Sequence, residues 1–83
     1  MEFVAEIDIM PHTELLDPQG SAVLHNMKYL DIHGVLNVRI GRHVTMVVEA
    51  QSEEEAREKV EAACQKLLAN QIMESYHYVL IAK

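Results

Sequence analysis

Two short segments carry residues whose types and spacing could bind another molecule. The first, Asp17-Pro18-Gln19-Gly20, combines a good helix N-cap with a proline that fits the first helical turn. Its glycine weakens a helical first turn by about 0.5–1 kcal/mol relative to alanine, but leaves room for an anion or a partner's backbone. These residues therefore form either an ordinary helix cap or a docking point.

The second segment is Arg39-Ile40-Gly41-Arg42, in which two arginines flank a glycine that suits a tight hairpin. Guanidinium groups pair with carboxylates and phosphates through parallel hydrogen bonds. The segment therefore indicates an acidic partner surface or a phosphate, unless the arginines serve solubility alone. We predict a partner interface made of the following residues: Asp17, Pro18, Gln19, Gly20, Arg39, Gly41 and Arg42.

Other residue types that could do chemistry lack the required spacing. The histidines form no close ligand pair, and no phosphate-binding loop or nucleophile elbow is present. They are His12, His25, His33, His43 and His77. Cys64 falls on the apolar stripe of a helix, which favours a small core residue over a nucleophile. We expect no catalytic residue, no cofactor and no metal on this chain.

Composition restricts the class of protein further. The 83 residues are enough for one domain, residues 1–83, and their formal net charge of −6 disfavours nucleic acid. A single cysteine suits a reducing compartment. No apolar run approaches the ~20 residues that span a membrane, and the N-terminus lacks the basic start of a signal peptide. We therefore expect a cytoplasmic protein.

Hydrophobic periodicity predicts the elements that would position these segments. Alternating patterns predict strands over residues 3–10, 35–40, 44–50 and 75–82. Helical stripes predict helices over 18–30 and from Ser52 to Asn70, where a left-handed asparagine would end the second helix. Gly41 would turn the second strand into the third. The order β-α-β-β-α-β predicts an α+β, ferredoxin-like fold, with a four-stranded antiparallel sheet and both helices on one face.

Apolar residues lie on both faces of the predicted sheet. A face that is not covered by helices should be polar in a soluble monomer. Here it would carry Val4, Met10, Val47, Val79 and Ile81. Because such a surface is normally covered, we predict self-association into a dimer or tetramer through the sheet.

Taken together, several segments resemble the PurS family, the small subunit of phosphoribosylformylglycinamidine synthase. They are residues 16–20 with Ala22-Val23, then 38–42, Glu49-Ala50, 52–60 and 64–70. The resemblance covers nearly the whole chain in the right order. It departs at Gln71, where family members often have proline, and at residues 1–13, which match only in their alternation.

The resemblance implies a noncatalytic assembly subunit in purine biosynthesis. Such a subunit joins a glutaminase subunit to an ATP- and magnesium-dependent synthetase subunit, so that ammonia from glutamine reaches formylglycinamide ribonucleotide. An ACT-type regulatory domain, with an effector at Gly20, is the alternative because it shares the element order. An acylphosphatase-like hydrolase would need an arginine within residues 11–17, which contain none.

Overall fold

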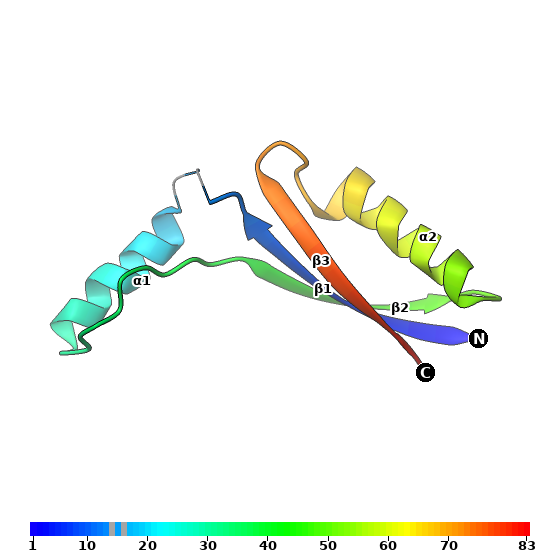
Figure 1. The fold of residues 1–83 in the computed structure, drawn as a ribbon, viewed down its shortest axis with the longest axis horizontal. Coiled ribbons are helices and arrows are strands. Elements are labelled where there is room, and N and C mark those ends of the chain that lie inside the picture. The colour runs from blue at the N-terminus through cyan, green and yellow to red at the C-terminus, as the bar shows by residue number, and fades with distance from the viewer. Residues whose placement is uncertain (14, 16) are drawn as a thin grey trace.

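The computed structural model describes residues 1–83 except 14 and 16. Its elements are β1 (Glu2–Pro11), α1 (Pro18–Tyr29), β2 (Arg42–Glu49), α2 (Glu53–Ala63), the π-helical turn η1 (Cys64–Leu68) and β3 (Glu74–Ala82). The strands form one antiparallel sheet in the order β2-β1-β3 (Figure 1). The α+β class predicted from the sequence is confirmed.

The core lies between the sheet and α2. Alternate residues of the central strand β1 point toward α2, as the two-residue period of a strand requires. The buried apolar residues are Phe3, Ala5, Ile7, Ile9, Val48, Ala50, Ala56, Val60, Cys64 and Ala69. One face of the sheet is therefore covered by α2 and the turn that follows it. We call the opposite, uncovered face the open face.

The start of α2 follows its sequence signals closely. Ser52 Oγ accepts a hydrogen bond from Glu55 N at 3.1 Å, and Glu55 Oε2 accepts one from Gln51 N at 2.9 Å. Three acidic residues occupy the first turn, where the helix dipole favours negative charge. These contacts confirm the N-terminus predicted for this helix.

The described residues form a three-stranded sheet, so the strand predicted over residues 35–40 does not form within a single chain. The segment is extended but pairs with no strand in the described part of the chain. It runs into β2 without a hairpin, because Gly41 does not take the expected positive φ. A Cβ at Gly41 would instead collide with the carbonyl oxygen of Ile9, so this glycine permits close contact with β1.

The prediction that both helices cover one face of the sheet is also wrong. α1 and the segment after it extend away from the sheet (Figure 1), and we call residues 17–41 the arm. Gly20 is the buried residue in α1. The molecule measures 52 × 27 × 14 Å as a result. Most side chains of α1 face water. The helix therefore does not cover the sheet, as the predicted ferredoxin-like fold would require.

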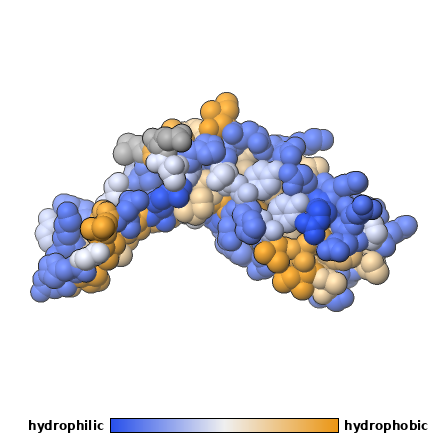
Figure 2. Space-filling view, in the orientation of Figure 1, coloured by the Kyte–Doolittle hydropathy of each residue, from blue (hydrophilic) through white to orange (hydrophobic). Residues whose placement is uncertain are grey.

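Apolar side chains of the arm are left exposed. Leu36 is 92% exposed and Tyr29 is 78% exposed. Figure 2 shows apolar surface along the arm and, at the other end of the molecule, near the sheet. In the part of the chain that the structure describes, no helix is long and apolar enough to cross a membrane.

Candidate functional site

Asp17 ties the two sides of the arm together at its base. Its Oδ1 accepts a hydrogen bond from Gly20 N at 3.0 Å, as an N-cap should, and its Oδ2 accepts one from Ile40 N at 2.8 Å. The Gly20 N–H, followed by the Ile40 N–H, lowers the pKa of Asp17 from its ordinary value. One carboxylate therefore caps α1 and holds the extended segment beside it.

Gly20 explains why the two sides of the arm can approach so closely. A Cβ at this position would overlap the carbonyl oxygen of Val38 and crowd the Asp17 carboxylate. The sequence suggested that Gly20 leaves room for another backbone, and the structure places a backbone there. That backbone belongs to this chain's own residue 38, not to a partner.

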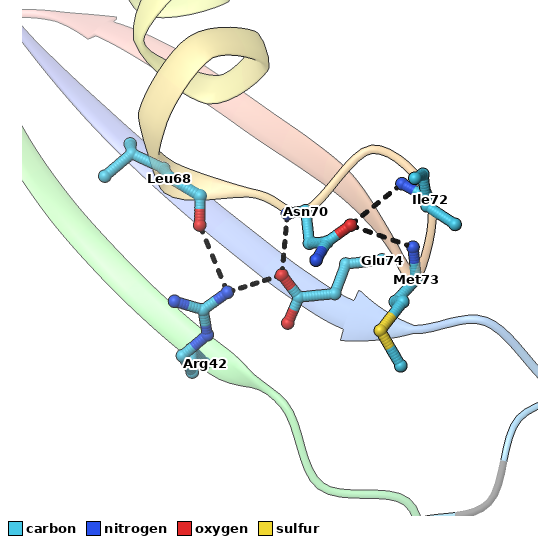
Figure 3. A network of polar contacts seen from close by, with 6 residues as sticks. All are labelled: Arg42, Leu68, Asn70, Ile72, Met73 and Glu74. Carbon is cyan, nitrogen blue, oxygen red and sulfur yellow. Dashed lines mark hydrogen bonds and ion pairs between the residues drawn. The ribbon is translucent and has the colours of Figure 1, made fainter.

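Both arginines of the second segment contact the chain itself. Arg39 Nη2 donates to the carbonyl oxygen of Pro11 at the end of β1. Arg42 Nη2 donates to Leu68 O at 3.1 Å and to Glu74 Oε1 at 2.7 Å (Figure 3). These bonds connect the base of the arm to the sheet and to the turn that follows η1.

The turn before β3 completes this network (Figure 3). Asn70 Oδ1 accepts from Ile72 N at 3.0 Å and from Met73 N at 3.3 Å, while Asn70 N donates to Glu74 Oε1 at 2.8 Å. The left-handed conformation predicted for Asn70 is wrong, because its side chain closes the turn instead. The Asn70 N–H, and then Arg42, lower the pKa of Glu74.

An open cleft of about 500 Å³ lies beside these contacts, at the junction of the arm and the sheet. It is lined by Pro11, Asp17, Pro18, Gln19, Ile40, Gly41, Arg42 and Glu74. Five residues of the predicted interface therefore lie together, although they come from two separate segments. Gly20 and Arg39 do not line the cleft, but Gly20 packs against Val38 and Arg39 donates to Pro11.

The predicted interface did not include Pro11, Ile40 and Glu74, which also line the cleft, although Ile40 belongs to the second segment. Pro11 ends β1, and Glu74 begins β3, the strand that pairs with it. The pairing of Pro11 with Glu74 brings both residues to the arm. No sequence motif marked either residue as part of a site, because prolines at strand ends and acidic residues at strand starts are common on protein surfaces.

The charged groups of the cleft are satisfied within the chain. Arg42 pairs with Glu74, and the Asp17 carboxylate pairs with backbone N–H groups. Among the described residues, no group of three His, Cys, Asp or Glu side chains could hold a metal ion. Cys64, the first residue of η1, is fully buried, and burial raises the pKa of its thiol, as fits a core residue.

We expect the base of the arm to loosen in acid. Because the pKa of Asp17 is lowered in the folded chain, its stabilising effect is complete above the unfolded value of about 4 and is lost as the pH falls through the folded value. The amide NMR signals of Gly20 and Ile40 should shift together in that range. Asp17→Asn should remove this transition, whereas Asp31→Asn, at an exposed turn, should retain it.

The described elements define a small α+β module with a cleft between its arm and its sheet. A family model described as PurS, phosphoribosylformylglycinamidine (FGAM) synthase, matches residues 4–82. The chain therefore belongs to the PurS family, and the resemblance drawn from the sequence is confirmed.

Individual relatives agree with the family match. The PurS subunit of this synthase from Bacillus subtilis is 41% identical over 64 residues, which are 77% of this chain and 75% of that protein. The structure of Thermus thermophilus PurS is 37% identical, with a TM-score of 0.88 over 100% of this chain and 99% of the other. A structure described as PurLQS from Thermotoga maritima contains a chain that is 28% identical, with a TM-score of 0.90 over 98% and 99% of the two chains.

Proposed function

We propose that this chain is the noncatalytic assembly subunit of phosphoribosylformylglycinamidine synthase in purine biosynthesis. In this role it holds the glutaminase subunit against the synthetase subunit, so that ammonia from glutamine reaches formylglycinamide ribonucleotide. Family membership and the similarity to a chain of the Thermotoga maritima PurLQS structure support this function. They do not favour an ACT-type regulatory domain.

The observation that carries the proposal is the pair of uncovered surfaces on an elongated molecule. The arm exposes apolar side chains such as Leu36 and Tyr29, whereas the open face of the sheet exposes Val47 and Ile81. Isolated proteins rarely leave extended apolar patches in water. A chain with two such surfaces on a body 52 Å long can contact more than one partner at once.

The cleft at the base of the arm is our candidate for contact with a catalytic subunit. Its proposed residues are Asp17, Pro18, Gln19, Gly20, Arg39, Gly41 and Arg42, of which Gly20 and Arg39 act by holding the arm in place. ATP and magnesium belong to the synthetase subunit in this proposal, and the chain itself holds no cofactor. A cytoplasmic location is part of the same proposal.

The open face and the free edge of β2 are our candidates for self-association. Val4, Val47 and Ile81 lie in register across the three strands and form an apolar row that a second copy would cover. The extended residues 35–40 alternate as a strand does and pair with no strand in the described part of the chain. In our proposal they pair with the free edge of β2 in a second copy, which completes a four-stranded, ferredoxin-like sheet between copies.

Co-purification tests the bridging role. The purified glutaminase and synthetase subunits are mixed with and without this chain, and the mass of the resulting species is measured by light scattering. We expect one species that contains all three subunits when the chain is present, and separate subunits when it is left out. A stable complex of the two catalytic subunits alone would contradict the proposal.

A further inference from the structure

Charged residues line up on the open face at both ends of its apolar row. Because β1 pairs with β2 and β3 in fixed register, each row contains one residue from every strand. The rows are His43–Asp8–His77, Thr45–Glu6–Val79 and Val47–Val4–Ile81. At the far end Glu49 lies opposite Glu2, which forms an ion pair with Lys83, the residue after β3. The apolar row is therefore flanked by polar rows, as in many protein interfaces.

His43 bridges two carboxylates of the central strand. Its Nδ1 lies 2.7 Å from Asp8 Oδ1, and its Nε2 lies 3.0 Å from Glu6 Oε2. Only the protonated imidazolium can donate through both nitrogens, because a neutral ring has one donor and one acceptor. Asp8, followed by Glu6, raises the pKa of His43.

We propose that His43, Asp8 and Glu6 form a proton-controlled switch for the association of two copies through the open face. The proposal rests on the self-association proposed above. With His43 protonated, the three side chains carry a net charge of −1, and both carboxylates are paired. With His43 neutral, the net charge is −2, and one ring nitrogen faces a carboxylate oxygen with no proton between them.

Association should respond to this charge in either orientation of the second copy. The three side chains would meet the same three of the partner copy or the row at the far end, where Glu2 and Glu49 outnumber Lys83. Both are net negative, so an extra negative charge on this copy is repelled. Covering the face also removes water, which makes an unpaired carboxylate more costly.

His77 is the matched control for His43. It sits on the same face, in register with Asp8 from the other side, and it is the remaining titratable group of that row. The structure places both nitrogens of His43, and not those of His77, on the carboxylates of β1. A switch at His43 should therefore survive the substitution His77→Gln.

Sedimentation velocity between pH 5.5 and 8.5, at constant ionic strength, tests the switch. For the wild type and His77→Gln, we expect the dissociation constant of the two copies to rise by about tenfold from pH 6 to pH 8, the change that corresponds to about half a pKa unit of coupling at each of the two His43 rings. For His43→Gln we expect no change with pH. Far-UV circular dichroism checks that each variant is folded.

NMR titration of the histidine rings separates this proposal from the one on which it depends. We expect the pKa of His43 to lie above its ordinary value, and Glu6→Gln to lower it. Wild-type association that does not vary with pH, or a pH dependence that persists in His43→Gln, would overturn the switch alone. A chain that stays monomeric at every pH would overturn self-association, and the switch with it.

Discussion

Gly20→Val should abolish assembly with the catalytic subunits while the sheet and α2 stay folded. A side chain at this position would overlap Val38 O, so α1 and residues 38–40 would have to separate. Overpacking of this kind costs about 1–3 kcal/mol where the surroundings cannot move. Here the arm can open instead, because α1 has few contacts elsewhere, and opening removes the hydrogen bond from Ile40 N to Asp17.

Co-purification with the catalytic subunits measures the loss, and far-UV circular dichroism checks the fold of the variant. Ser21→Ala is the matched control, since it changes the next residue of α1, which is exposed. It should assemble as the wild type does. If Gly20→Val assembled normally, the geometry of the arm would not matter for binding.

Ile7→Ala should instead lower the folding stability of the chain itself. Ile7 is fully buried at the centre of β1, and truncating a buried isoleucine costs about 2–5 kcal/mol. A chain of 83 residues is expected to have a free energy of unfolding of about 4–12 kcal/mol in total. We therefore expect a large fall in the urea midpoint, or an unfolded chain.

Val47→Ala is the matched comparison on the open face, where Val47 is 55% exposed. Its effect on the unfolding of a single chain should stay below about 0.5 kcal/mol, as for most surface substitutions. Self-association, measured by sedimentation, should nevertheless weaken. If both variants lost the same free energy of unfolding, contacts with a second copy would have to contribute to the measured stability.

Local signals in the sequence predicted the elements around the core. The alternation of residues 3–10 identified β1 because its buried side chains follow every second position. The spacing of Ser52 and Glu55 identified the start of α2, since both caps act within one turn. Family resemblance added the function, which neither periodicity nor composition could have supplied.

Contacts between distant residues were beyond reach of the sequence patterns. Residues 35–40 alternate as a strand does, but a strand also needs a neighbour, and Gly41 does not form the hairpin that would supply one. The glycine at position 20 was recognised as unusual, yet its reason is Val38, which lies far along the chain. Contacts between segments that are far apart in the sequence depend on the whole fold. The pattern of residues within one segment therefore does not reveal them.

The most direct test of the bridging role compares two nitrogen donors in the reconstituted synthase. Activity is measured with glutamine and, separately, with ammonium salts, in the presence and absence of this chain. We expect removal of the chain to abolish most of the glutamine-dependent activity and to leave much of the ammonia-dependent activity. Unchanged activity with glutamine in the absence of the chain would contradict the account.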